Sequence, residues 1–572
     1  MEHFVSSKDK TLHGQSGRLN LLESRATRFT THKIQDNVTL TDLERDRLKS
    51  GFGGGYRYLP IELFMTDEGY FVFDAKNVHF LKVDRVAFDM LSILRGRNVG
   101  LDELIVLLPQ HSDDQLRQAY RDLLTVQADN LLVSYHFQRA LRHDNSQYEK
   151  VLSERMEGFT VFTTTECNLG CSYCIYGGQY KQHEKLSQVS MSWNTLKNTM
   201  KFLHAHSRKS PEIRLDFFGG EPLIAFKLIK RGVEYLKSII TPDGQKVAVT
   251  ISSNGTIITH EILDFLILNN VYLQFSLDST KTGHDRYRKI KGNKQGSFER
   301  IIKNLQKIYD RSPKYFRNNL RLKGVITPEA LENKDGKVFK HPLVQLIVSE
   351  GHYSFVVKEP YYDLAKDSDH FFNMLHTLGR VLLRMEGLRS DQDIIKKLNV
   401  IQAALYHDTF GRFFNMQITS QVYFNGEDST PFTKGCLTGY KEGAVSGNGD
   451  IFICHKSAKG ENLVIGNVNE GVWYYEKMKD LNTILHLDWT GCTSCYLQKV
   501  CDLCFEKLNG DKGRFAAGIS NFCEFNCAKY QVIFDYMLQV TEKNPELWQY
   551  IDSVIKDKMT KQDLPREDAE VS

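Results

Sequence analysis

The placement of the cysteines constrains this chain more than any other feature of its sequence. The 572 residues include 11 cysteines, and none of them precedes Cys167. Three lie between Cys167 and Cys174, and the other eight lie between Cys436 and Cys527. The count is odd, and the first residues lack the apolar core of a secretion signal. Both features argue against a disulfide framework, so we expect metal ligands in a reducing, cytoplasmic setting.

Composition and charge exclude two classes of partner. Hydrophobic residues make up 41% of the chain and charged residues 25%, as in ordinary globular proteins. No run approaches the roughly 18 apolar residues of a membrane-spanning helix. The 74 basic and 70 acidic residues leave a formal net charge of +4. This balance gives no electrostatic reason to expect a nucleic acid partner. We therefore expect a chain that acts without membrane or nucleic acid.

The N-terminal part combines a linker with a small predicted domain. Residues 1–55 are polar and end in a glycine-rich stretch, which is typical of an extension or linker. Within residues 56–137, short β-prone runs predict a three-stranded antiparallel meander at 61–65, 70–73 and 78–81. Three helices are expected to follow, at 86–94, 101–108 and 113–127. The segment has no cysteine and no cluster of catalytic residue types, so we expect a small independent domain with a binding role.

Strands and helices alternate between residues 155 and 360. The predicted strands are 159–163, 214–218, 247–251, 272–276, 320–326 and 354–357. Amphipathic patterns predict helices at 193–204, 225–240, 260–268, 298–309 and 342–350. Six β/α repeats predict an α/β fold with a parallel sheet, open or closed into a partial barrel. The chemistry of such folds lies at the carboxyl ends of the strands.

The remaining segments are expected to support this core. Residues 361–430 are predicted to form a helical bridge, and residues 431–530 contain the eight C-terminal cysteines. Residues 531–572 are predicted to form a C-terminal helix and a charged tail.

The first cysteine cluster has the spacing C-x3-C-x2-C, formed by Cys167, Cys171 and Cys174. Three thiolates on one short loop can hold three corners of a [4Fe–4S] cluster, which leaves the fourth iron open to substrate or cofactor. Zinc is the alternative, but a structural zinc site normally takes four protein ligands. His183 is a candidate for the fourth.

Residues 155–360, with this loop, resemble the radical S-adenosylmethionine (SAM) superfamily. The resemblance implies a partial (β/α)6 TIM barrel. It also implies that SAM binds at the open iron and is cleaved by one-electron reduction. The resulting 5′-deoxyadenosyl radical would abstract an inert hydrogen from the substrate.

The resemblance also implies a set of SAM contacts. Tyr173 matches the aromatic position near the adenine. Two glycines let a ligand approach the backbone closely, and a Glu carboxylate can accept a hydrogen bond from an ammonium. The family's GGEP motif receives the methionine amine, and here it is Gly219, Gly220, Glu221 and Pro222. Ribose and carboxylate contacts are expected at Ser276 and Arg288, with Asn254 and Asp278 as further candidates. Each of these four could equally be a cap or a surface group.

The eight C-terminal cysteines are enough for two four-ligand sites. They are Cys436, Cys454, Cys492, Cys495, Cys501, Cys504, Cys523 and Cys527. Spacing alone also permits two zinc sites with four thiolates each. The pattern resembles the SPASM domain of radical SAM peptide maturases, which implies two auxiliary [4Fe–4S] clusters and three clusters in all.

The same resemblance implies how the ligands are shared between the two auxiliary clusters. One cluster would take Cys492, Cys495, Cys501 and Cys523. The other would take Cys436, Cys454 and Cys504, with Cys527 as the only thiol left to complete it. Related sulfatase maturases have an Asp base directly after the second SPASM cysteine, where this chain has His455. A histidine can accept a proton near neutral pH, so His455 is a candidate base.

Residues 56–137 resemble the PqqD-like RiPP recognition element (RRE), a winged-helix-like domain that binds the leaders of ribosomally made, modified peptides. A winged-helix DNA-binding domain is the alternative, and the lack of a basic recognition helix counts against it.

Together, the resemblances imply a cytoplasmic radical SAM enzyme that crosslinks a precursor peptide. The bond would be a thioether, or else C–C or ether. The electron donor would be a protein such as flavodoxin or ferredoxin. A formylglycine-forming sulfatase maturase and a non-enzymatic zinc scaffold are the alternatives.

Overall fold

The structure of the chain is a computed structural model. The residues it describes are 59, 61–66, 69–76, 78–97, 99–128, 131–132, 138–140, 145–174, 176, 189–240, 244–278, 280–326, 341–350, 352–356, 364–411, 429–431, 443–457, 463–485, 495–497, 500–501, 503, 519–547 and 549–550. The predicted linker, the charged tail, His183, Cys436, Cys492 and Cys504 lie outside the described residues.

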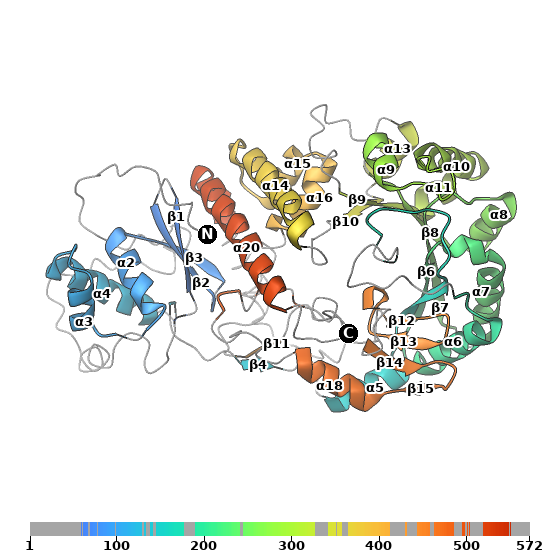
Figure 1. Ribbon diagram of the computed structural model, residues 1–572, viewed down its shortest axis with the longest axis horizontal. Helices are drawn as coiled ribbons and strands as arrows, with labels where there is room; N and C mark the ends of the chain where they lie inside the picture. Colours follow the sequence, from blue (N-terminus) through green and yellow to red (C-terminus); the bar gives the residue numbers. More distant parts are fainter. Residues whose placement is uncertain are drawn as a thin grey trace.

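Six parallel strands form the main part of the largest sheet, in the right half of Figure 1. They are β5 (Gly158–Thr164), β6 (Glu212–Gly219), β7 (Lys246–Ser253), β8 (Tyr272–Ser276), β9 (Leu320–Val325) and β10 (Tyr353–Val356). They lie in the order β10–β9–β8–β7–β6–β5, and every neighbouring pair is parallel. The predicted strands and the α/β fold with a parallel sheet are thus confirmed.

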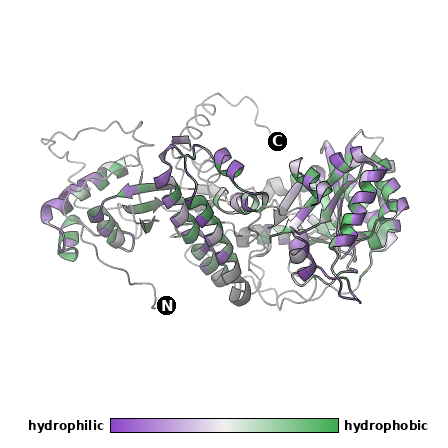
Figure 2. Ribbon diagram, turned by 90° about the horizontal axis from the view of Figure 1, so that it is seen from above, coloured by the Kyte–Doolittle hydropathy of each residue, from purple (hydrophilic) through white to green (hydrophobic). Residues whose placement is uncertain are grey.

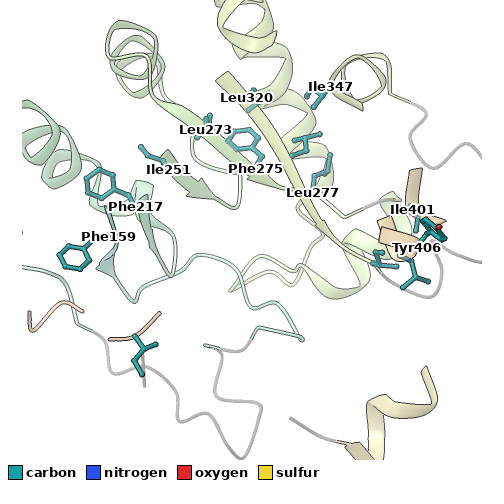
Figure 3. Packing of buried hydrophobic residues seen from close by; sticks show 14 of the residues in the cluster. Phe159, Phe217, Ile251, Leu273, Phe275, Leu277, Leu320, Ile347, Ile401 and Tyr406 are labelled. Atoms are coloured by element: carbon teal, nitrogen blue, oxygen red, sulfur yellow. The ribbon is translucent and has the colours of Figure 1, made fainter. Parts of the chain in front are cut away.

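Helices cover the apolar face of this sheet. The predicted ones are α6 (Trp193–His206), α7 (Phe226–Ile240), α8 (His260–Leu268), α10 (Phe298–Arg311) and α13 (Pro342–Ser349). Three short ones were not predicted: η2 (Pro222–Ala225), α9 (Lys281–Tyr287) and α11 (Pro313–Asn319). Phe217, Ile251 and Phe275 are fully buried on this face (Figure 3). Alternate residues of the strands therefore face the helices, and those between them line the inner face.

Four strands from the cysteine-rich region extend the same sheet. They are β12 (Gly443–Val445), β13 (Asp450–Phe452), β14 (Val464–Asn467) and β15 (Val472–Trp473). β12 pairs with β5 in parallel, and β13 to β15 continue antiparallel. Residues 431–530 were predicted as a separate region. Strands this short carry almost no periodic signal, so the shared sheet could not be predicted from the sequence.

The N-terminal meander and its helices are present as predicted. The strands are β1 (Ile61–Thr66), β2 (Gly69–Asp74) and β3 (His79–Val83), in the order β1–β2–β3. The helices are α2 (Arg85–Leu94), α3 (Leu101–Leu107) and α4 (Asp113–Ala128). α2 begins directly after β3 because Asp84 caps it, accepting a hydrogen bond from the Ala87 N–H at 2.8 Å. Val72 and Leu81 pack with these helices in one apolar cluster.

The other face of the meander packs against α20 (Ile519–Lys543), so this unit is in contact with the C-terminal part of the chain (Figure 1). The Phe534 ring of α20 lies 5.6 Å from that of Phe64, 4.6 Å from Phe73 and 5.1 Å from Phe80, between centroids. All four belong to the cluster that also contains the core of the large sheet.

The remaining elements surround these two parts. α14 (Leu364–Leu383), α15 (Asp391–Lys397) and α16 (Val400–Asp408) lie in the predicted helical bridge. The others are α5 (Asn145–Glu154), η4 (His455–Ser457), α18 (Tyr475–Leu485) and the parallel pair β4 (Gln138–Ala140) and β11 (Ser429–Pro431). Hydrophobic residues gather on the strands and on inward-facing sides of helices (Figure 2). None of the described helices combines the length and apolar character needed to cross a membrane.

Candidate active site at the carboxyl edge of the parallel sheet

The cysteine loop after β5 is held as one strand of a short antiparallel ribbon. The Gly170 and Ser172 N–H groups donate to the carbonyls of Lys289 and Tyr287, at 2.8 and 3.0 Å. The Lys291 N–H donates to the Asn168 carbonyl at 2.9 Å. The partner strand follows α9, and the sequence analysis did not find it. Gly292, directly after Lys291, was the sequence feature that could have predicted a turn at this place.

The two glycines of the GGEP sequence let β6 approach this loop. The Gly220 N–H donates to the Thr164 carbonyl at 2.9 Å, and the Glu221 N–H donates to the Glu166 carbonyl at 2.7 Å. A Cβ on Gly219 would lie 2.2 Å from the Thr164 oxygen, and one on Gly220 would lie 2.1 Å from the Glu166 oxygen. Gly219 also has a φ of +126°. The sequence analysis expected a ligand to approach these glycines, and in the structure the start of the cysteine loop approaches them.

Glu221 ties β6 to the end of β7. Its buried carboxylate accepts hydrogen bonds from the Leu223 N–H at 3.0 Å, the Ser253 hydroxyl at 2.9 Å and the Asn254 N–H at 2.7 Å. These donors favour the charged form, but burial dominates and raises the pKa of Glu221 to about 7. Pro222 begins the following turn and is also buried. The expected contact of Glu221 with the methionine amine stays a prediction.

Asn254 connects β7 to the cysteine loop. Its side-chain N–H group donates to the Asn168 oxygen at 2.8 Å and lies 3.7 Å from the Cys167 sulfur. Its side-chain oxygen accepts from the Thr256 N–H and hydroxyl, and Asn168 in turn donates to that hydroxyl. The Cys167 sulfur also accepts from the Leu169 N–H at 3.4 Å. Sequence reasoning missed Asn168 and Thr256, although Asn168 lies inside the cysteine motif.

Asp278, Arg288 and Tyr173 form a buried ion-pair network after β8. The Arg288 guanidinium donates to both Asp278 oxygens, at 3.0 and 3.3 Å, and the Tyr173 hydroxyl donates to Asp278 at 2.5 Å. The Val325 N–H of β9 supplies a further donor at 2.9 Å. The Arg288 guanidinium carbon lies 5.2 Å from the centre of the Tyr173 ring. The Arg288 guanidinium lowers the pKa of Asp278, although the burial of this carboxylate acts in the opposite direction.

His284 holds this network in place through hydrogen bonds. Its Nδ1 accepts the Asp278 N–H at 3.1 Å, and its Nε2 lies 2.9 Å from the Ser297 hydroxyl, which donates to the Arg288 carbonyl. Burial lowers the pKa of His284 to about 3, so the ring is neutral. A neutral ring with Nδ1 as acceptor carries its proton on Nε2. The anchoring role of His284 was not predicted from the sequence.

Ser276 is the predicted SAM contact whose side chain stays uncommitted. It is half-buried on the inner face of the sheet, beside Lys323 in the register of β8 and β9. Within the described part of the chain, no group hydrogen-bonds its hydroxyl. By contrast, the polar atoms of Asp278 and Asn254 already have protein partners.

His455 follows β13 and lies beside the end of β6. Its ring centre is 5.6 Å from that of Phe218, and its carbonyl accepts the Tyr176 hydroxyl at 2.8 Å. Burial, with the nearby Lys456 and Lys323 charges, lowers the pKa of His455 to about 4. The ring is therefore neutral and able to accept a proton, although weakly.

Four of the described C-terminal thiols lie on α20 or pack against the same apolar core. Cys523 and Cys527 lie four residues apart on one helix face, and Cys495 and Cys501 pack against the same core. The Cys495 thiol hydrogen-bonds with Cys527, which raises the pKa of Cys495 and lowers that of Cys527 to about 7. Cys527 thus neighbours a cysteine that was expected in the other cluster, and the expected allocation stays a prediction. Cys454 lies at the end of β13.

The loop thiols fit cluster ligation in their chemistry. Burial raises the pKa of Cys167, and raises that of Cys171 to about 12, so a bound cation is needed to hold these groups as thiolates. The Cys167 sulfur already accepts an N–H donor, as cluster thiolates do. Among the described residues, no three His, Cys, Asp or Glu side chains are grouped around a single ion position. Three ligands of a cluster each bind a different iron, which is a wider arrangement.

Comparison with known proteins identifies the central segment. Residues 161–320 match the family model described as Radical SAM superfamily. This segment is a radical SAM domain. Such a domain implies SAM and a [4Fe–4S] cluster.

Two curated relatives match parts of the chain. A cysteine-type anaerobic sulfatase-maturating enzyme of Clostridium novyi is 34% identical over 144 residues, which are 25% of this chain and 37% of that enzyme. The radical SAM cyclopropyl synthase TigE of Paramaledivibacter caminithermalis is 23% identical over 254 residues, which are 42% of this chain and 51% of that enzyme. The matches thus span about a third to a half of these relatives.

A solved structure aligns over more of the chain. The structure titled native anSMEcpe with bound AdoMet has a TM-score of 0.46 and 14% sequence identity. The alignment covers 68% of this chain and 99% of that one.

Proposed function

We propose that the chain is a radical SAM enzyme that modifies a ribosomally made precursor peptide. The observation that carries the proposal is the C-x3-C-x2-C loop, held at the carboxyl edge of a parallel sheet inside a radical SAM domain. The names of the two relatives, a sulfatase-maturating enzyme and a cyclopropyl synthase, favour a modification reaction. A crosslink, with a thioether favoured over C–C or ether, is the expected product.

When bound, SAM and the cluster would supply the radical that removes a hydrogen atom from the peptide. Cys167, Cys171 and Cys174 would hold the cluster. Ser276 would contact SAM from the inner face of the sheet, and the Tyr173 ring would lie near the adenine. His455, neutral and beside the end of β6, would accept the proton released by the peptide. The C-terminal cysteines would hold two auxiliary clusters.

The N-terminal unit is proposed to bind the leader of the peptide. The proposed mode is addition of the leader as a further strand beside β3, the last strand of the meander. The helices α2 and α4 cover one face of this sheet and α20 contacts the other, so the edge is the surface left for an extended peptide. The electron donor would be a small redox protein of the flavodoxin or ferredoxin class.

A sulfatase maturase is the second candidate, favoured by the 34% identity to the Clostridium novyi enzyme. His455 stands where those enzymes carry an Asp base, which counts against this candidate. A zinc scaffold is the third candidate, because its thiol ligands are also present.

Co-expression separates these candidates. The full chain is produced with each short peptide encoded beside its gene, and the peptides are analysed by mass spectrometry. Loss of two hydrogens from one peptide, absent with a Cys171→Ala variant, is the expected result. Conversion of a cysteine to formylglycine in a sulfatase-derived peptide would instead favour the second candidate. Zinc without iron or sulfide in anaerobically purified protein would contradict both enzyme candidates.

A further inference from the structure

Arg288 lies directly opposite Cys171 in the ribbon that holds the cysteine loop. The hydrogen-bonded pairs of this ribbon are Gly170 with Lys289 and Ser172 with Tyr287. The residues between them, Cys171 and Arg288, therefore form a non-hydrogen-bonded pair. In such a pair the side chains project from the same face and approach each other most closely. The bridge between Leu169 and Ile290 confirms this register.

The Arg288 side chain is fixed in this place by protein groups. Asp278 holds the guanidinium through two hydrogen bonds, the Tyr173 ring covers it, and only a tenth of the side chain is exposed. The register of the ribbon puts Arg288, and not Asp278, opposite Cys171. The cationic member of the pair is therefore the one that neighbours this cysteine across the ribbon.

We propose that Arg288 stabilises the reduced form of the loop cluster electrostatically, before any SAM is bound. The inference rests on the proposed function, because it requires the cluster. Reduction adds one electron next to Cys171, and a fixed cation across the ribbon favours that added negative charge. Asp278 opposes this effect partly and keeps the guanidinium in place. The role differs from the carboxylate contact implied by family resemblance, which would operate only with SAM present.

The test is a redox titration of SAM-free, anaerobically reconstituted full-length protein with dithionite, followed by electron paramagnetic resonance. The signal missing from a Cys167/Cys171/Cys174→Ala variant reports the loop cluster. At the wild-type midpoint, Arg288→Met should lower the ratio of reduced to oxidised loop cluster about tenfold, which is about 59 mV for one electron. Arg288→Lys, which keeps the charge, should shift less than half as far.

Two further variants control for folding and for net charge. Lys289→Met removes the same charge from the neighbouring exposed residue of the ribbon, and should change the ratio less than twofold. The double variant Arg288→Met/Asp278→Asn leaves no unpaired buried carboxylate. It should shift in the same direction as Arg288→Met but less far, because Asp278 opposes Arg288. If Arg288→Met loses the signal, this double variant decides the question.

Four results would overturn the inference while leaving the cluster assignment intact. They are an unchanged ratio in Arg288→Met, an equal shift in Lys289→Met, an equal shift in Arg288→Lys and an unchanged ratio in the double variant. Absence of any loop-cluster signal from the wild-type protein would instead contradict the proposed function.

Discussion

The chain holds its two groups of cysteines by different physical means. The loop Cys167–Cys174 is fixed by polar contacts: a backbone ribbon, the Glu221 and Asn254 hydrogen bonds, and the Asp278–Arg288 pair. Cys523 and Cys527 instead lie on a long helix whose place depends on apolar packing. The first group needs short-range hydrogen bonds in exact register, whereas the second needs two distant segments to dock.

This difference predicts which substitutions and solution conditions affect each group of cysteines. α20 is pressed against the N-terminal meander by Phe534, so changes in that sheet should reach the C-terminal thiols. The loop is anchored within the radical SAM domain and should not feel them. Charge and pH should act more strongly on the loop, because the Glu221 and Asp278 carboxylates are fully buried beside it.

The largest effect is expected from Phe534→Ala. Removing a buried phenylalanine costs about 3–5 kcal/mol, and here the ring contacts Phe64, Phe73 and Phe80 at once. Chemical denaturation should show the loss in the transition of the N-terminal meander and α20. Iron content should fall by the amount bound at the C-terminal thiols, while SAM cleavage persists.

A matched variant reverses this pattern. Phe226→Ala removes a buried ring of α7 that contacts Phe265 at 5.4 Å, inside the radical SAM domain. It should impair SAM cleavage first. If Phe534→Ala and Phe226→Ala each lower both SAM cleavage and the iron bound at the C-terminal thiols, the two regions are not held separately.

A smaller effect is expected from Glu221, through pH. Its pKa is raised from 4.5 to about 7, so the folded chain binds a proton more tightly than the unfolded chain. The free energy of unfolding should therefore fall as pH rises from about 4.5 to 7, by about 3 kcal/mol, and stay level above that. Glu221→Gln should remove this dependence. Parallel pH profiles of wild type and variant, measured by denaturation, would show that the carboxylate is not the cause.

The smallest effect is expected at the edge of the α20 contact. Glu542 accepts hydrogen bonds from Thr66 at 3.0 Å and from Lys82 at 3.2 Å, and Lys82 is about a third exposed. Glu542→Gln should cost about 1 kcal/mol in denaturant unfolding, because the ion pair is partly screened by water. High salt should shrink the difference from wild type. A difference that does not respond to salt would assign the effect to packing.

Sequence reasoning reached the first region better than the second. The strands of the parallel sheet and the residues at their ends were predicted, since buried strands and glycine turns leave local signals. The contacts of Asn168 were missed, because its partners Thr256 and Asn254 lie far away in the sequence. Gly219 and Gly220 lie close to the Thr164 and Glu166 carbonyls, and their expected contact with SAM stays a prediction.

In the second region only the cysteines themselves were informative. Nothing in their spacing showed that β12 would join β5, or that α20 would contact the meander. The neighbour of Cys527 is Cys495, which was expected to bind the other cluster. Helical periodicity also brings Cys523 and Cys527 to one face of α20. Pairing between distant segments depends on surfaces that no local pattern encodes.

The central claim is that the Cys167–Cys174 loop holds the cluster at which SAM is cleaved. Its most direct test measures 5′-deoxyadenosine from the reduced, anaerobically reconstituted chain and from the Cys167/Cys171/Cys174→Ala variant, with iron counted in both. The account predicts that the wild type forms 5′-deoxyadenosine, and that the variant forms none while it retains the iron bound at the C-terminal thiols. Formation of 5′-deoxyadenosine by the variant at the wild-type rate would contradict the account.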